Sequence, residues 1–301
     1  MIMMMKKITT IWRQQQHGLF TFSCLLLSVT LIFACSDIDE SERLTVVNYV
    51  EVDTTAVEPT PQDTIDFFAP TTRRILVEDF TGQDCVNCPN ATDLIAQLQE
   101  MYGHNTVVAV GIHSGPLGVK PSKHPEGLAT DLGDTYYNYW NIEMQPYGVI
   151  DRSDGPLSTD WWAAKVSYDL YADDAKTTLR TVPLNIWVQV TTTQRQAEID
   201  IVLAGTSGTI TGKLQVWLVE KGIKAFQKMP DGSTKTDYVH NHVLRCAVNG
   251  DWGEDCTVAE GKLQTFSYTC PIDAGWKFTN IDVVAFVYNE DGVVQVTTTD
   301  E

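Results

Sequence analysis

The chain has 301 residues and carries 21 lysines and arginines against 39 aspartates and glutamates, a formal net charge of −18 at pH 7. This negative excess argues against nucleic acid as a partner and against electrostatic docking on anionic lipid. The length allows two domains of more than about 100 residues, each large enough to bury its own core.

The N-terminus has the pattern of a targeting segment. A basic region precedes a mostly apolar stretch over 18–34, and Cys35 follows directly. This order resembles a bacterial lipoprotein signal, in which residues 1–34 are removed and Cys35 is lipidated. Ordinary secretory cleavage and a retained membrane anchor remain alternatives.

Residues 35–70 are predicted to be a tether between the lipid and the first domain. The segment is acidic, rich in Thr and Pro, and without sustained periodicity. Its acidic start after Cys35 resembles the surface-export signal of Bacteroidetes lipoproteins, which implies an outer-membrane protein that faces the cell surface. A poorly ordered terminus is the structural alternative.

The most informative motif is Cys85-Val86-Asn87-Cys88-Pro89, which lies between an apolar run over 75–80 and helical periodicity over 91–101. A strand, a short turn and a C-x-x-C at a helix start are typical of thioredoxin-type redox sites. The helix N-terminus would stabilise a thiolate on Cys85, so we expect Cys85 to attack and Cys88 to resolve. An inert disulfide or half of a zinc site would show the same spacing.

The chain resembles a thioredoxin-like domain at two further positions. Thioredoxin folds carry a cis-proline that faces the C-x-x-C, just before the strand that follows their second helix. Pro146, after the buried-strand pattern over 106–112, matches that order. Asp79 falls where thioredoxins keep a buried carboxylate that relays the proton of the resolving thiol, and burial would raise its pKa. A strand-edge carboxylate bonded to backbone is the structural alternative.

Strands and helices alternate through residues 71–182, which form the predicted thioredoxin-like domain. We expect further helices over 126–140 and 158–175 in this segment. An insertion rich in Gly and Pro over 114–125 separates the second strand from the first of these helices.

Residues 183–301 change character, because short runs alternate between apolar and polar residues. This pattern predicts an immunoglobulin-like antiparallel β-sandwich, so the expected fold class is α/β plus all-β. The runs cover 184–190, 197–203, 213–219, 239–248, 263–270, 281–288 and 293–298.

Three segments together resemble one family. They are Leu76-Val77-Glu78-Asp79-Phe80-Thr81-Gly82 with the C-x-x-C, Pro146-Tyr147-Gly148-Val149-Ile150-Asp151-Arg152, and His240-Asn241-His242-Val243-Leu244-Arg245 with Gly250-Asp251-Trp252-Gly253-Glu254. The combination resembles the outer-membrane-protein-twenty-eight-like lipoproteins of Bacteroidetes. The resemblance implies a thioredoxin-like domain followed by a β-sandwich on an outer-membrane lipoprotein, and it implies no established activity.

The remaining cysteines are expected to pair, because the cell envelope is oxidising. Besides Cys85–Cys88, three cysteines can form one bridge and leave one thiol or an intermolecular bond. We prefer a bridge between Cys246 and Cys256, which would clamp the loop around Trp252, over one with Cys270.

A metal site is a weaker candidate. His240, His242 and Cys246 share one strand face if their alternation is unbroken. Strand histidines more often bond to backbone or solvent, and no further C-x-x-C or histidine pair has zinc-finger spacing, so we expect no metal or cofactor.

His113 ends its strand near the C-x-x-C and is interpreted as a structural histidine, with a contact to the cysteine loop as the alternative.

Two classes of function remain open. One is a binding or adhesion lipoprotein that uses the thioredoxin-like part as a scaffold and takes a protein or glycan partner. The other is a thiol–disulfide oxidoreductase that uses Cys85 and Cys88, with Asp79 and Pro146 in the site. Asp84 stands where thioredoxins have a tryptophan, and its carboxylate would oppose a thiolate on Cys85. The sequence therefore favours the binding role and leaves the enzymatic one open.

Overall fold

Strands dominate the described part of the chain, residues 65–152 and 182–300 of a computed structural model. None of the helices in these two ranges is long and apolar enough to cross a membrane. The elements are β1 (Ile75–Thr81), α1 (Cys88–Tyr102), β2 (Val107–His113), α2 (Asp131–Tyr139), β3 (Tyr147–Ile150), β4 (Leu184–Thr192), β5 (Gln196–Gly205), β6 (Thr209–Glu220), β7 (Ile223–Lys228), β8 (Thr234–His240), β9 (Val243–Ala247), β10 (Glu254–Ala259), β11 (Leu263–Pro271), a 3₁₀ turn (Phe278–Asn280), β12 (Ile281–Asn289) and β13 (Gly292–Thr298).

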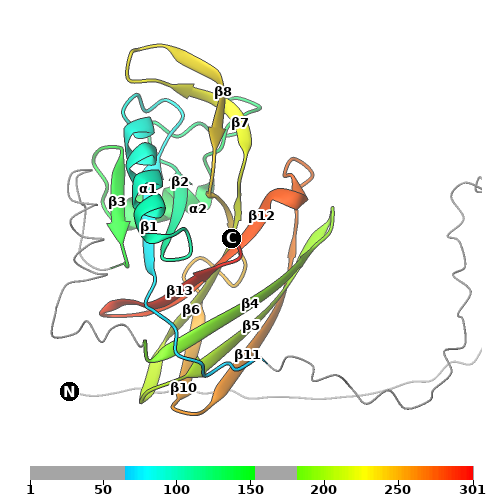
Figure 1. The fold of residues 1–301 in the computed structure, drawn as a ribbon. Coiled ribbons are helices and arrows are strands. Elements are labelled where there is room, and N and C mark those ends of the chain that lie inside the picture. Colours follow the sequence, from blue (N-terminus) through cyan, green and yellow to red (C-terminus); the bar gives the residue numbers. More distant parts are fainter. Residues whose placement is uncertain (1–64, 153–181, 301) are drawn as a thin grey trace, which may run out of the picture. The chain divides into compact units, whose positions relative to one another are not determined.

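The first three elements form a βαβ unit (Figure 1). β1 and β2 pair in parallel, and β3 joins the outer side of β1 in antiparallel orientation. Ala91, Ile95 and Leu98 recur at the spacing of one helix face and pack α1 onto the sheet. Successive residues of β1 face opposite sides, so Val77 packs under α1 and Phe80 packs on the other face. The predicted strand–helix–strand unit is confirmed.

One mixed sheet contains strands from both predicted domains. Its order is β13-β12-β6-β9-β2-β1-β3, with β10 paired to β6. The junction is short, because β9 meets β2 in parallel at the single pair Gly111 and Val243. The domain boundaries at residues 71–182 and 183–301 stay predictions, and the two segments share this sheet.

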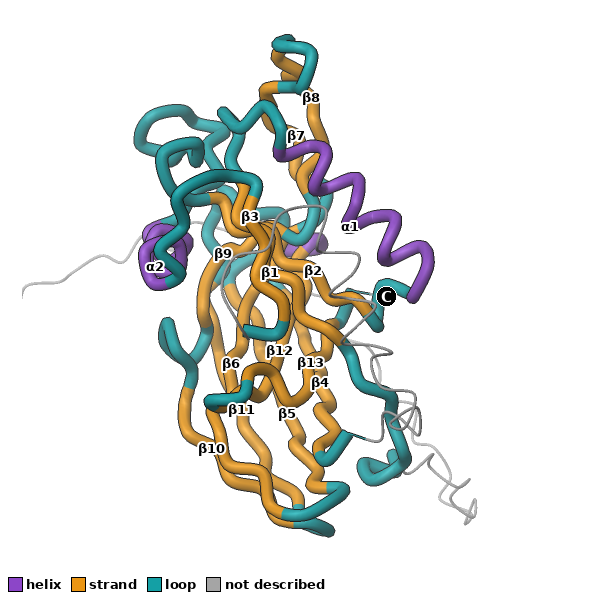
Figure 2. Tube along the Cα trace, turned by 90° about the vertical axis from the view of Figure 1, so that its left-hand side faces the viewer, coloured by secondary structure: helices purple, strands orange, loops and turns teal. Residues whose placement is uncertain are grey.

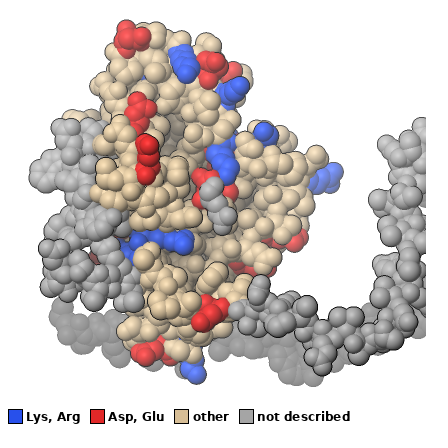
Figure 3. Space-filling view, in the orientation of Figure 1, with Lys and Arg blue, Asp and Glu red and all other residues tan. Residues whose placement is uncertain are grey.

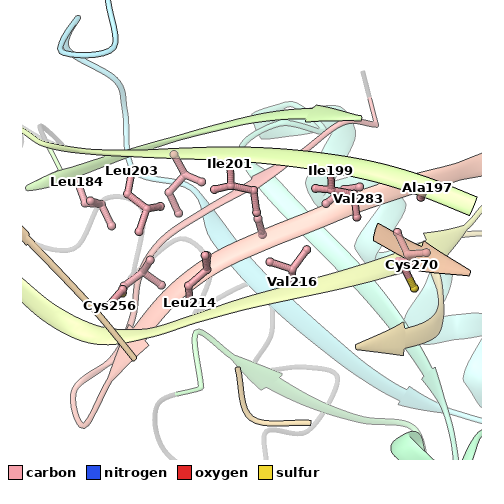
Figure 4. Packing of buried hydrophobic residues seen from close by; sticks show 14 of the residues in the cluster. Leu184, Ala197, Ile199, Ile201, Leu203, Leu214, Val216, Cys256, Cys270 and Val283 are labelled. Carbon is pink, nitrogen blue, oxygen red and sulfur yellow. The ribbon is translucent and has the colours of Figure 1, made fainter. Parts of the chain in front are cut away.

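A second, three-stranded sheet of order β11-β5-β4 packs on one face of β6 and β12 (Figures 1 and 2). Alternate residues fill the space between the sheets, as Figure 4 shows for Ile199 and Ile201 of β5 opposite Val216 of β6. The intervening residues of β6, such as Trp217, point into a separate core on the other face. This alternation is the physical basis of the strand periodicity in the sequence.

The core on that other face contains a buried ion pair. Arg152 lies 3.4 Å from Glu78, and their side chains are 4% and 0% exposed. Asp151 and Arg152 both have left-handed backbone, with φ of 54° and 52°, directly after β3. The guanidinium carbon lies 4.7 to 5.6 Å from the ring centroids of five aromatic residues, Tyr136, Trp217, Trp252, Phe286 and Tyr288. We call this arrangement the arginine cage.

Several predicted elements differ in detail from the structure. The run over 239–248 is two strands, because the chain turns at His242, whose φ is 54°. β7 and β10 were not expected from the sequence, since their alternation is short. α2 begins at Asp131 rather than at 126. Thr130 caps this start, because its side-chain oxygen accepts a hydrogen bond from the backbone N–H of Gly133 at 2.9 Å. The helix expected over 158–175 lies outside the described residues.

The arginine cage predicts a large stability difference between a buried and an exposed ion pair. Glu78→Gln should lower the free energy of unfolding by about 3–5 kcal/mol, because it leaves the buried Arg152 without a counter-charge. The matched control is Asp255→Asn, which breaks the 2.7 Å pair between Lys213 and the exposed Asp255. Asp255→Asn should lower the free energy of unfolding by less than about 1 kcal/mol. Urea unfolding of the three proteins measures both values, and equal losses would contradict a stabilising role for the cage.

Candidate functional site

Cys85 and Cys88 form a disulfide at the start of α1, with their Cα atoms 5.4 Å apart. The helix begins at Cys88, and Pro89 occupies its first turn, where no N–H donor is required. Cys85 lies in the preceding turn and donates its N–H to the carbonyl of Gly82 at 3.0 Å. Both cysteines are only 1% exposed. In this oxidised state the two cysteines are therefore equally buried, and the roles expected for Cys85 and Cys88 stay predictions.

The hairpin formed by β7 and β8 lies next to the cysteine loop and is bonded to it (Figure 1). Gln227 of β7 is buried, and its Nε2 donates to the carbonyl oxygens of Cys85 at 2.9 Å and Gly82 at 3.2 Å. The hairpin comes from the C-terminal half of the sequence, more than a hundred residues after the cysteines. A buried side chain thus holds the hairpin on the cysteine loop.

A second set of bonds joins the same two segments. The backbone N–H of Lys228 donates to the carbonyl of Gln83 at 2.9 Å. The Gln83 side chain donates to the carbonyl of Phe226 at 3.2 Å. The ammonium group of Lys228 lies 3.0 Å from the carboxylate of Asp84. Asp84 therefore has a counter-charge that the sequence interpretation did not foresee, and its opposition to a thiolate on Cys85 is reduced.

The insertion after β2 packs against the cysteine loop from another side. Asp84 donates its N–H to the carbonyl of Leu117 at 3.0 Å. A Cβ atom at Gly82 would come within 2.3 Å of that same carbonyl oxygen, so the close approach requires glycine. The loop that carries the cysteines is fixed by the insertion and by the hairpin together.

A cavity of about 170 Å³ lies behind the disulfide, between α1, the ends of β1 and β2, and the hairpin. Asp79 and His113 lie on the face of the sheet that α1 covers, since Asp79 pairs in register with Gly111 and His113 lies two residues further on. The polar and sulfur-containing residues that line the cavity include Asp79, Cys88, His113, Gln227, Tyr238 and His240. The structure thus brings one cysteine of the pair and the predicted carboxylate together.

Asp79 is buried as predicted, at 4% exposure. Burial raises its pKa from 3.8 to about 7, because the charged form loses its hydration. Its Oδ1 atom has no hydrogen-bond partner among the described residues, so the backbone-bonded alternative does not account for this oxygen. A carboxyl with this pKa can give or accept a proton near neutral pH.

His113 and His240 meet at the far side of the cavity, with ring centroids 5.1 Å apart. Burial lowers the pKa of both, for His113 well below its ordinary value and for His240 to about 4, so both are neutral at pH 7. His113 Nδ1 and His240 Nε2 have no hydrogen-bond partner within the described ranges. His113 contacts a histidine of the hairpin, a partner that sequence reasoning did not identify.

The proposed metal set does not assemble. His240 ends β8, the chain turns at His242, and Cys246 lies on β9, so the three residues do not share one strand face. The premise of unbroken alternation is wrong. Among residues 65–152 and 182–300, no cluster of three His, Cys, Asp or Glu side chains is arranged to hold a metal ion.

Pro146 lies beside the cysteine loop. The Gln145–Pro146 bond is cis, as the thioredoxin resemblance implied. Because Tyr147 pairs with Phe80, Pro146 stands opposite Thr81 at the end of β1. The Gln145 side chain donates to the carbonyl of Thr81 at 2.7 Å, which fixes the turn at that place.

The preferred bridge between Cys246 and Cys256 is wrong in this structure. The sulfur of Cys246 lies 3.4 Å from that of Cys270. Figure 4 shows Cys256 and Cys270 at opposite ends of the core between the two sheets. The sequence suggested Cys256 because a bridge to it would clamp the loop around Trp252, whereas strand pairing decides which cysteine is nearer in space.

Comparisons with known proteins agree with the sequence resemblance. The chain is similar to HBP35 of Porphyromonas gingivalis, with 16% identity, a TM-score of 0.56, and 75% of this chain and 74% of that chain covered. It is also similar to protein AGR_C_4864 from Agrobacterium tumefaciens, with 14% identity, a TM-score of 0.50, and coverage of 76% and 95%. At these identities the likeness concerns the fold alone.

A domain of the outer membrane lipoprotein Omp28 from Porphyromonas gingivalis matches with 26% identity and a TM-score of 0.29, over 39% of this chain and 86% of that domain. No curated protein matches the chain. The family model described as outer membrane protein Omp28 matches residues 133–300, which is more than half of the sequence. The chain therefore belongs to the Omp28 family of outer membrane proteins.

Proposed function

We propose that this outer membrane lipoprotein carries a thiol–disulfide exchange centre, formed by Cys85 and Cys88 on a thioredoxin-like domain. One observation carries the proposal: Cys88 and Asp79, whose pKa is about 7, line the same cavity. The βαβ unit with a disulfide at its helix start, and the cis bond before Pro146 opposite the end of β1, support the thioredoxin-like assignment of residues 71–182. The two packed sheets support an immunoglobulin-like sandwich over residues 183–301.

The chemistry follows from the oxidised pair. The thiolate of a substrate dithiol attacks the sulfur of Cys85, a substrate–Cys85 bond forms, and Cys88 leaves as a thiolate. Asp79 gives its proton to that thiolate. The second substrate thiol loses its proton to solvent and attacks the substrate sulfur of the mixed disulfide, which releases Cys85 as a thiolate. Two electrons pass from the substrate to the protein, and the reverse sequence reduces a substrate disulfide.

Burial sets a condition on this chemistry. Since both cysteines are 1% exposed, an incoming sulfur can reach Cys85 only when a segment packed on the loop moves, and we propose that this segment is the hairpin. Gln227 and Lys228 hold the hairpin in place. The rate of exchange would then be limited by breaking these bonds.

The same burial favours a second candidate function. A binding or adhesion protein needs no access to the sulfurs, and in such a protein the disulfide fixes the loop as a structural bridge. Its partner would be another protein or a glycan. On the face shown in Figure 3, acidic and basic side chains of the described residues are dispersed, so charge does not single out a docking area there.

Family membership implies attachment to the outer membrane. We propose that a lipid on Cys35 provides this attachment and that residues 35–70 hold the folded part away from the membrane at the cell surface. Residues 1–64 lie outside the described part of the chain. Stable anchoring takes more than one acyl chain, which a triacylated cysteine would supply.

The raised pKa of Asp79 predicts a pH-dependent stability difference. The folded state holds the Asp79 proton more tightly than the unfolded state, where the pKa is near 3.8. Below the unfolded-state pKa of 3.8, protonated Asp79 makes its full contribution to the stability of the folded state. That contribution is lost as the pH rises through about 7. Asp79→Asn should therefore gain stability relative to wild type between about pH 5 and about pH 8, by a few kcal/mol at most. Urea unfolding at both pH values measures the difference in the free energy of unfolding between Asp79→Asn and wild type. Asp237→Asn, which changes an exposed aspartate, is the control. A constant difference would remove Asp79 from the proton-transfer role.

The exchange mechanism predicts asymmetric trapping. Reduced Cys88→Ser should react with glutathione disulfide to form a mixed disulfide through Cys85, with release of one glutathione thiolate, and reduced Cys85→Ser should form far less, as measured by mass spectrometry. The potential of the wild-type pair should lie above about −300 mV, the value below which structural disulfides fall. Gln227→Leu should speed reduction by dithiothreitol roughly tenfold, because it removes buried hydrogen bonds from the hairpin.

The control for Gln227→Leu is Gln194→Leu, which changes an exposed glutamine in the turn between β4 and β5. The exchange centre would be excluded if the Cys85–Cys88 disulfide resisted dithiothreitol in both glutamine variants and Cys88→Ser trapped no glutathione. The structural bridge of a binding protein would then be the better account.

The anchor prediction concerns Cys35. Cells that express the wild-type chain should incorporate labelled palmitate into the protein, and Cys35→Ala should incorporate none. Equal labelling of both would exclude this residue as the lipid site. Protease treatment of intact cells should remove the wild-type protein if it faces outward, and its retention would assign it to the periplasmic face.

A further inference from the structure

Cys246 and Cys270 lie on different sheets and face each other. Cys246 belongs to β9 of the large sheet, where it pairs with Leu218 of β6. Cys270 belongs to β11 of the three-stranded sheet, where it pairs with Ala197 of β5. Their sulfurs are 3.4 Å apart. A disulfide bond is about 2.05 Å long, so the two sulfurs need to approach by only about 1.4 Å.

The backbone on both sides of the two sulfurs is already fixed. The carboxylate of Glu220 accepts from the Arg245 guanidinium at 2.7 Å, next to Cys246. Its other oxygen accepts from the Lys277 backbone N–H at 2.9 Å, shortly after β11. One side chain thus ties β9 to the segment that follows β11. The two sulfurs already face each other across the sheets at 3.4 Å, so the strands that carry them stand close enough for their side chains to meet.

Cys256 is placed differently. It lies on β10 opposite Gly212 of β6, is 3% exposed, and stands at the other end of the core from Cys270 (Figure 4). Burial raises the pKa of its thiol to about 11, which keeps it protonated and unreactive. The sulfurs of Cys246 and Cys270 therefore face each other, whereas the Cys256 thiol lies apart from Cys270.

We infer that Cys246 and Cys270 form a disulfide that bridges the two sheets of the sandwich in the oxidising envelope, and that Cys256 remains a free thiol. This inference does not depend on the function proposed for Cys85 and Cys88. The bridge lies on β9, the strand that also pairs with β2 at Val243. It would therefore link the three-stranded sheet directly to the strand that joins the two halves of the chain.

The oxidant is another disulfide, either glutathione disulfide or a protein disulfide of the envelope. One cysteine attacks it as a thiolate, a mixed disulfide forms, and one oxidant thiolate leaves. The second cysteine then loses its proton and attacks the first sulfur, which releases the other oxidant thiolate. Two cysteine thiols are oxidised and the oxidant is reduced to two thiols. Cys270 is 8% exposed in the folded chain, so the exchange takes place during folding, before the sheets close.

Peptide mapping tests the inference. The full-length protein is isolated from the envelope with free thiols alkylated at lysis, and its peptides are analysed without reduction. We expect the Cys246 peptide linked to the Cys270 peptide and Cys256 alkylated. Alkylation of both Cys246 and Cys270, or a link from either to Cys256, would overturn the inference.

A stability measurement provides a second test in the double variant Cys85→Ser, Cys88→Ser, which removes the other bridge. Dithiothreitol should lower the melting temperature of this protein, because the unfolded chain regains the freedom that the bridge removes. Adding Cys246→Ser should abolish the shift, whereas adding Cys256→Ser should leave it unchanged. A shift that persists without Cys246, or one lost without Cys256, would contradict the assigned pairing.

Discussion

The buried pair of Glu78 and Arg152 is the interaction on which the arrangement of the described residues depends. A guanidinium taken out of water is costly unless a carboxylate and surrounding groups replace its hydration. Here the carboxylate comes from β1 and the aromatic faces come from α2, β6, β12 and the loop before β10. Arginine suits this place because its planar, weakly hydrated cation stacks on rings while it pairs with an acid. Elements distant in sequence are therefore required to meet around one side chain.

The same strand that supplies Glu78 supplies Asp79 to the opposite face. Strand alternation makes this unavoidable, since successive side chains point to opposite sides. The pKa of Glu78 is raised by burial, and Arg152 opposes that shift. Asp79 has no such counter-charge among residues 65–152 and 182–300, and burial raises its pKa to about 7. Two adjacent carboxyls thus serve different purposes because of what lies on each face of the sheet.

The hairpin of β7 and β8 decides what the cysteines can do. The disulfide stands at a helix N-terminus, the usual setting of a reactive thiol, and the hairpin packs on the loop that carries it. Gln227 binds the loop carbonyls and Lys228 neutralises Asp84, so the hairpin restricts access to the sulfurs and changes the charge around them. Access and electrostatics at this site therefore come from the C-terminal half of the chain, although the cysteines come from the N-terminal half.

Local patterns in the sequence were sufficient to predict the βαβ unit, the helix start next to the C-x-x-C and most strands of the second half, because each depends on residues within one element. The resemblance to thioredoxin folds added the burial of Asp79 and the cis bond at Pro146. The sequence could not show that Lys228 faces Asp84, that His240 meets His113, that Arg152 enters an aromatic cage, or that Cys246 faces Cys270 rather than Cys256. Those contacts join residues tens to more than a hundred positions apart. Only the pairing order of the strands, through the single junction of β9 with β2, decides which of them become neighbours.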